Sequence, residues 1–159
     1  MYICKMNSEN KSIDFENSIG PWLGKTVKLL DYILQESFKK NELDLSKEQM
    51  IVLKKLHDQD GLNQNELAFL TLRNKSSLTR LLSKMESKKY ITRMRDVDDK
   101  RINRVYITPY GKEIFKKTRP VIRTLIETME KDISPKEKEL MIKVLKKIQE
   151  NFSSKTEYL

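Results

Sequence analysis

The sequence predicts a mainly α fold with one small β-hairpin, an α+β class, formed by a single domain over residues 1–159. Gly and Pro number four each, too few for the many turns of a β-sandwich. Helix-start signals recur along the chain, and one stretch between residues 91 and 108 alternates apolar and polar side chains. These observations predict six helices and two strands.

The first predicted helix begins near Ser18 and extends to about residue 42. Pro21 is tolerated in it because the first turn of a helix does not need that N–H. Apolar residues then repeat at helical spacing: Ile19, Trp22, Leu23, Val27, Leu30, Ile33, Leu34 and Phe38.

Two shorter helices follow, each opened by a capping box. Ser46 and Gln49 fit this pattern, in which each side chain accepts a hydrogen bond from the other residue's free backbone N–H. After a turn at residues 60–61, Asn63 and Glu66 repeat it. The sequence therefore predicts a second helix and a short third one.

The fourth predicted helix, capped by Asn74, has two chemically different faces. Its inward face carries Leu78, Leu81, Leu82 and Met85. At 100° per residue, the outward face carries Ser76, Arg80, Ser83 and Ser87, flanked by Thr79.

Positive charge is concentrated on this helix and on the hairpin after it. Eleven basic and four acidic residues lie between Arg73 and Gly111, so this segment holds +7 of the net charge of +9. An α-helix fits the major groove of DNA, and Arg80 is the best candidate for reading base edges. The alternative is a solvated surface helix, the usual origin of a charged stripe. The predicted DNA contacts of this helix are Lys75, Ser76, Ser77, Thr79, Arg80, Ser83 and Lys84.

The hairpin is predicted at residues 91–95 and 104–108, around a polar turn. Basic side chains crowd this turn, where they repel one another unless a polyanion attracts them. An acidic residue beside Arg101 could form an ion pair that orients the guanidinium for a narrow minor groove. A plain surface turn is the alternative. The predicted hairpin contacts are Arg93, Arg95, Asp99, Lys100, Arg101 and Arg104.

Residues 99–111, DKRINRVYITPYG, resemble the wing signature of the MarR (multiple antibiotic resistance regulator) family. Residues 74–82, NKSSLTRLL, are similar to the start of that family's recognition helix. The resemblance implies a winged helix-turn-helix with a DNA-binding lobe at 46–110. It also implies that Arg101 reaches the minor groove while Asp99 positions it. Ile102 stands where many relatives have a small residue.

The remaining helices are expected to join two copies of the chain. Thr108-Pro109 and Ser134-Pro135 start a fifth and a sixth helix, and the apolar stripes of segments 18–42 and 111–153 exceed what one small core can cover. A homodimer covers them, and it would place two recognition helices on a pseudo-palindromic operator in double-stranded DNA. We therefore expect a transcriptional regulator, a repressor by function. A monomeric helical bundle is the alternative.

The family resemblance also implies a pocket for a small-molecule effector. Trp22, Tyr32, Met50 and His57 are candidate lining residues, although such side chains at helical spacing more often form core. Some relatives sense oxidants through a cysteine, but Cys4 lies well upstream of the first helix and only Lys5 is near to lower its pKa.

Other classes of function fit the composition less well. One His and one Cys are too few for a zinc site, no nucleophile is spaced to meet His57, and no glycine-rich phosphate loop occurs, so we expect no enzyme, metal or cofactor. The chain has no apolar run of signal-peptide or membrane-spanning length, and a single cysteine suits the cytoplasm. A winged-helix module that binds protein or RNA, without a ligand response, remains the rival.

Overall fold

The computed structural model describes residues 14–152, which belong to two compact units divided between Ile33 and Leu34. Cys4 lies outside the described residues. The secondary structure is mainly helical with a small antiparallel sheet, which confirms the predicted fold class. Helix α1 (Ile19–Lys40) begins in the first unit and ends in the second. The predicted single domain and its division into a DNA-binding lobe and dimerisation segments stay predictions.

The described part of the first unit opens with a hydrogen-bonded turn. The Asp14 carboxylate accepts the backbone N–H of Asn17 at 3.0 Å, and the Ser18 hydroxyl donates to the Asp14 carbonyl at 2.9 Å. The Trp22 indole N–H donates to the Glu16 carbonyl at 2.8 Å. These bonds fix the chain where it enters α1.

The second unit holds the other helices: α2 (Lys47–Asp58), α3 (Gln64–Leu70), α4 (Lys75–Ser87), α5 (Pro109–Met129) and α6 (Pro135–Glu150). Each starts at the N-cap that the sequence predicts, because a side-chain oxygen there accepts a backbone N–H that the helix itself leaves free. The five caps are Ser46, Asn63, Asn74, Thr108 and Ser134.

Three antiparallel strands form the sheet: β1 (Leu62–Asn63), β2 (Ile91–Arg95) and β3 (Asn103–Ile107), in the order β1-β3-β2. The predicted hairpin is confirmed, with its second strand starting one residue earlier. The two-residue strand β1 was not predicted, since it is too short for an alternating pattern.

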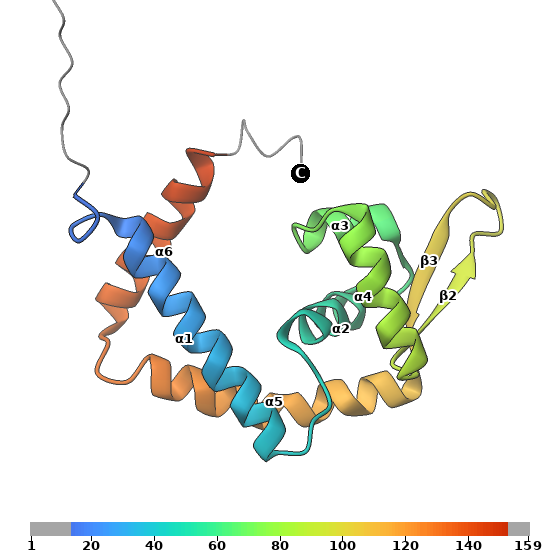
Figure 1. Cartoon of the computed structure of the whole chain (residues 1–159), viewed down its shortest axis with the longest axis horizontal. Coiled ribbons are helices and arrows are strands. Elements are labelled where there is room, and N and C mark those ends of the chain that lie inside the picture. Colours follow the sequence, from blue (N-terminus) through green and yellow to red (C-terminus); the bar gives the residue numbers. More distant parts are fainter. Residues whose placement is uncertain (1–13, 153–159) are drawn as a thin grey trace, which may run out of the picture. The chain divides into compact units, whose positions relative to one another are not determined.

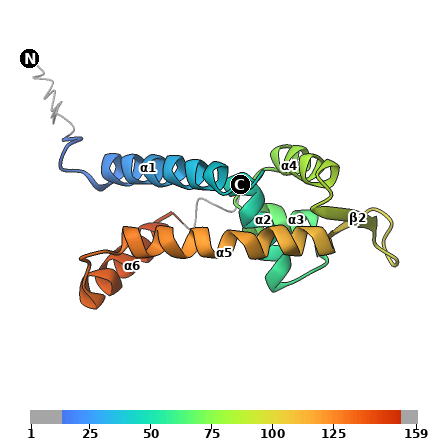
Figure 2. The same ribbon diagram turned by 90° about the horizontal axis from the view of Figure 1, so that it is seen from below.

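The core of the second unit lies among the end of α1, α2, α4, α5 and the sheet. Phe38, Leu53, Leu78, Leu82 and Val105 are completely buried in it. Helix α4 lies beside the hairpin β2–β3 (Figure 1), and the hairpin projects beyond the amino-terminal end of α5 (Figure 2).

In residues 14–152, four helix ends are followed by a non-glycine residue with a left-handed φ, and two of these reversals lie between α3 and the hairpin. Leu72 after α3 and Lys89 after α4 have φ values of 51° and 61°, in the left-handed region. The following N–H groups close six-residue rings, from Arg73 to the Ala68 carbonyl and from Tyr90 to the Met85 carbonyl, both at 2.9 Å. These reversals turn α3 into α4 and then α4 into the hairpin.

Candidate nucleic-acid interface

Helix α4 presents a buried apolar face and an exposed polar one. Leu78, Leu82 and Met85 have no exposed surface, whereas Arg80 and Lys84 are exposed. Leu81, predicted to face inward, is only half-buried and packs against the edge of the core. The amphipathic division of α4 is therefore the one that the sequence predicts.

The small polar residues of α4 are held by local hydrogen bonds. Ser76 donates to the Asn74 side chain at 2.9 Å, and Thr79 donates to the Lys75 carbonyl at 2.8 Å. Ser77 is half-buried and accepts from the Arg73 guanidinium at 2.9 Å. Among these predicted contacts, Ser76 and Thr79 are exposed, while Ser77 binds within the protein.

Arg93, predicted as a hairpin contact to DNA, joins the hairpin to α4. Its guanidinium donates to the Glu86 carboxylate through Nη2 at 2.6 Å and Nε at 3.1 Å, and its backbone N–H donates to the same carboxylate at 3.1 Å. Nη2 also lies 3.3 Å from Ser83 Oγ. The guanidinium lowers the pKa of Glu86 because it favours the ionised carboxylate.

Arg104, a second predicted contact, organises the hairpin from within. Its Nε donates to Asp96, and its Nη1 donates to the Gly61 carbonyl at 3.1 Å. The other oxygen of Asp96 accepts the backbone N–H groups of Asp98 at 2.9 Å and Asp99 at 3.1 Å. Asp96 thus connects the turn to β3, and Arg104 in turn connects β3 to the residue before β1. The Arg104 hydrogen bond, followed by those from the two backbone N–H groups, lowers the Asp96 pKa.

Asp99 contacts the backbone of Arg101, whereas the sequence suggests an ion pair with its side chain. Its carboxylate accepts the backbone N–H of Arg101 at 2.9 Å, and residues 14–152 contain no ion pair between the two side chains. The short side chain of an aspartate readily accepts the backbone N–H two residues ahead. The Arg101 side chain therefore stays exposed.

Six of the predicted cationic contacts remain available to a ligand. Each is exposed, and none makes an ion pair or a side-chain hydrogen bond with any other residue between 14 and 152. They are Lys75, Arg80 and Lys84 on α4, and Arg95, Lys100 and Arg101 on the hairpin.

Known proteins share these features of sequence and fold. The MarR family model matches residues 45–102. The HTH-type transcriptional regulator SarZ of Staphylococcus epidermidis is 32% identical over 105 residues, which is 62% of this chain and 69% of SarZ. The chain belongs to the MarR family. It is therefore a DNA-binding transcriptional regulator and not an enzyme.

Two solved structures show the same fold as this MarR-family chain. BpsR of Bordetella bronchiseptica, whose DNA binding is regulated by 6-hydroxynicotinic acid, is 19% identical with a TM-score of 0.79, over 86% of this chain and 96% of BpsR. The repressor CouR, solved bound to a 23-mer DNA duplex, is 18% identical with a TM-score of 0.79, over 89% of this chain and 99% of CouR.

Two acidic residues that position cations of this MarR-family protein were missed from the sequence. Glu86 and Asp96 hold Arg93 and Arg104 across different secondary structure elements. Spacing rules link charges within one helix, so they give no signal for such pairs.

The predicted effector residues belong to both compact units. Trp22 and Tyr32 are exposed in the first unit. In the second, Met50 packs against the core, and the His57 ring lies 5.0 Å from the Phe115 ring and 3.5 Å from an Arg119 nitrogen. The effector pocket stays a prediction.

Within the described part of the chain no helix suits a membrane span, and no cluster of His, Cys, Asp or Glu suits a metal.

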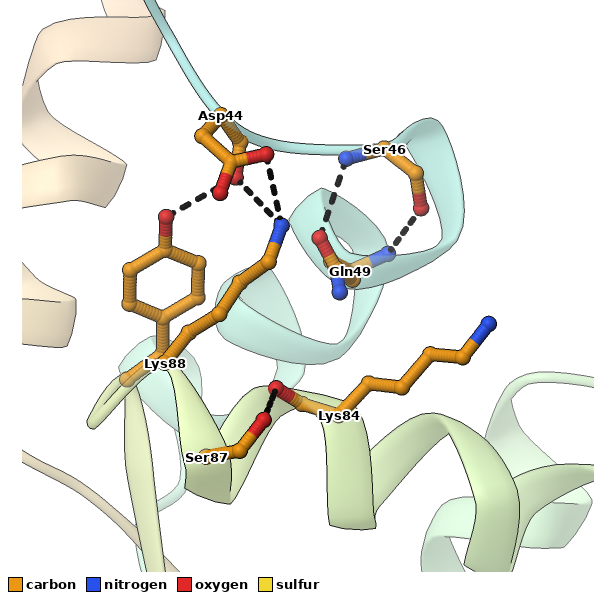
Figure 3. Close-up of polar contacts among 7 residues, drawn as sticks. Asp44, Ser46, Gln49, Lys84, Ser87 and Lys88 are labelled. Atoms are coloured by element: carbon orange, nitrogen blue, oxygen red, sulfur yellow. Dashed lines mark hydrogen bonds and ion pairs between the residues drawn. The ribbon is translucent and has the colours of Figure 1, made fainter.

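The carboxyl-terminal end of α4 is fastened to the segment between α1 and α2 (Figure 3). The Lys88 ammonium donates to the Asp44 carboxylate at 2.8 Å and to its carbonyl at 2.9 Å, while the Tyr90 hydroxyl donates to the same carbonyl at 2.8 Å. Burial, followed by the Asp44 charge, raises the Tyr90 pKa. A hollow of about 1010 Å³ extends along α4 beside these residues, and Arg80 and Lys84 also line it.

Proposed function

We propose that this MarR-family protein is a homodimeric repressor that binds a pseudo-palindromic operator, with α4 in the major groove and the β2–β3 hairpin as a wing in the adjacent minor groove. One observation carries the proposal. Exposed cations with no ion pair to any residue in 14–152 lie on α4 and on the hairpin, and the Arg93–Glu86 pair joins those two elements. Phosphates on both sides of a groove attract such an arrangement.

The homodimer is supported by α6, which has no buried residue in the single chain. Leu140, Met141, Ile142 and Val144 are exposed on it, with 61% of the Leu140 surface accessible. A helix with an apolar stripe is stable when that stripe is covered. A second copy of the chain would cover it and would place two recognition helices about 34 Å apart, one turn of DNA.

Repression and release by a small molecule are supported by analogy. CouR is a repressor solved on DNA, and the DNA binding of BpsR is regulated by 6-hydroxynicotinic acid. We extend repression and regulation by a small molecule to this chain, in the cytoplasm, with DNA as its partner.

The decisive experiment selects genomic fragments bound by the protein and then titrates salt on the strongest duplex. Phosphate neutralisation should make the affinity fall steeply with salt. Arg101→Ala should weaken binding to all sequences and reduce the slope by about 1. Equal binding to unrelated RNA, with no selected duplex, would overturn the proposal in favour of an RNA-binding module.

A further inference from the structure

A second hollow, of about 220 Å³, separates the recognition helix from the wing. The start of α3, the start of α4 and the turn end of the hairpin, where β3 begins, line it together. We call this hollow the notch. Its polar lining includes Gln64, Asn65, Lys75, Thr79, Arg101 and Asn103.

The docking proposed above predicts what lies in the notch. A helix in the major groove and a wing in the next minor groove stand on either side of one sugar-phosphate strand. That strand must pass between α4 and the hairpin. The notch is the hollow found between them, so it is where the strand would lie.

The chemistry of the notch suits a phosphate. Lys75 and Arg101 supply two cations with no partner in residues 14–152, and none of the residues that line the notch is acidic. A cation site would need carboxylates. Two carboxylates bond residues that line the notch and are engaged in doing so: Glu66 accepts the Asn63 N–H at 2.7 Å, and Asp99 accepts that of Arg101 at 2.9 Å.

Two neutral amides in the notch are free to donate. Asn65 and Asn103 are exposed, and in the described part of the chain neither side chain makes a hydrogen bond. Gln64 is different, since its amide lies 3.5 Å from the Thr79 hydroxyl. An amide N–H is a good donor to a phosphate oxygen and carries no sequence information.

We propose that the notch holds the phosphodiester strand between the two grooves, and that Asn65 and Asn103 donate hydrogen bonds to its phosphates. This inference rests on the proposed function and adds two contacts that the basic residues do not reveal. Both residues would set the register of the protein on DNA without reading bases.

The test measures binding of Asn65→Ala and Asn103→Ala to the selected duplex and to an unrelated duplex of equal length. Each variant should lose roughly tenfold in affinity for both duplexes, because a hydrogen bond to a charged group is lost. The salt slope should stay unchanged, since no charge is removed, whereas Lys75→Ala should reduce it by about 1. Asn41→Ala, an exposed asparagine at the end of α1, is the matched control and should bind like the wild type.

A second measurement locates the contact on the DNA. A duplex with one neutral methylphosphonate in the strand between the two grooves should bind the wild type more weakly than the unmodified duplex does. On this modified duplex, Asn103→Ala should have nearly the same affinity as the wild type. If both asparagine variants bind like the wild type while Arg101→Ala binds more weakly, the proposal that the notch holds the phosphodiester strand is overturned and the proposed function stands. If Arg80→Ala and Arg101→Ala also bind like the wild type, the proposed function itself fails.

Discussion

The Arg93 guanidinium lies 2.6 Å from the Glu86 carboxylate and so joins the first hairpin strand to helix α4. Both side chains are partly shielded, with 24% and 38% of their surfaces exposed. The same carboxylate also accepts the Arg93 backbone N–H, so the strand itself is held and not only its side chain. Arg93, which the sequence predicts to contact DNA, therefore fixes the hairpin relative to α4, and the exposed cations on those two elements with it.

A double-mutant cycle should measure this connection. Glu86→Ala, Arg93→Ala and the double variant should give a coupling free energy of about 1 kcal/mol in urea unfolding, since two guanidinium N–H groups donate to one Glu86 oxygen and the contact is partly buried. The exposed pair Glu113–Lys117, at 2.8 Å on α5, is the matched control and should give a clearly smaller coupling free energy, because solvent screens it. Equal coupling free energies in the two pairs would show that the Arg93–Glu86 pair stabilises the fold no more than an exposed ion pair within one helix.

Arg80 should carry sequence preference. Arg80→Ala should lose roughly 1 to 3 kcal/mol on the selected duplex and much less on unrelated DNA, because a base contact is lost. Lys84→Ala, on the same face one turn later, should weaken both duplexes alike. Competition binding with base-pair variants of the duplex measures the difference, and an unchanged preference in Arg80→Ala would exclude it as a reader.

The wing should lose stability in acid. A carboxyl whose folded pKa is depressed stabilises the fold above its ordinary pKa, 3.8 for Asp96, and this contribution is lost as the pH falls through the folded value. The melting temperature of the wild type should therefore drop as the pH falls below about 4 and through the lowered pKa of Asp96, and Asp96→Asn should show a smaller drop because asparagine does not titrate. Asp98→Asn, exposed on the same turn, should keep the wild-type slope.

Gly111 should tolerate no side chain. A Cβ there would lie 2.0 Å from the Tyr90 carbonyl oxygen and 3.1 Å from Ile107. Because backbone blocks the space, Gly111→Ala should cost about 3 kcal/mol in unfolding free energy. Gly24→Ala is the control, since nothing lies within 4 Å of the new Cβ and alanine favours a helix. Equal stability of the two variants in urea unfolding would show that the Tyr90 carbonyl does not exclude a methyl group at Gly111.

Helix α6 should belong to the dimer contact. Leu140→Asn should shift the protein towards the 18.9 kDa monomer in light scattering, because each copy loses a buried leucine worth about 2 kcal/mol. The neighbouring Glu139→Asn makes the same change in helix propensity without removing apolar surface and should stay dimeric. A Leu140→Asn protein that dimerises like the wild type would place the contact elsewhere.

Local patterns account for the parts of the fold that were predicted correctly. An N-cap such as Ser46 or Asn63 acts on backbone only three residues away, so its sequence is enough to place the start of a helix. The stripe of α4 is local for the same reason. Strand β1 and the left-handed residues Leu72 and Lys89 were missed, since neither a two-residue strand nor a reversal without glycine has a local signature.

The amino-acid order alone specified where the helices start, which face of α4 is apolar and where the positive charge lies, since each depends on neighbours within a few residues. Folding in three dimensions decided which of those cations are free. Within residues 14–152, Arg93 and Arg104 are bound by Glu86 and Asp96, while Arg80 and Arg101 are not, because pairing depends on distances between elements that sequence spacing does not give. The notch arises in the same way, from α3, α4 and the hairpin brought together.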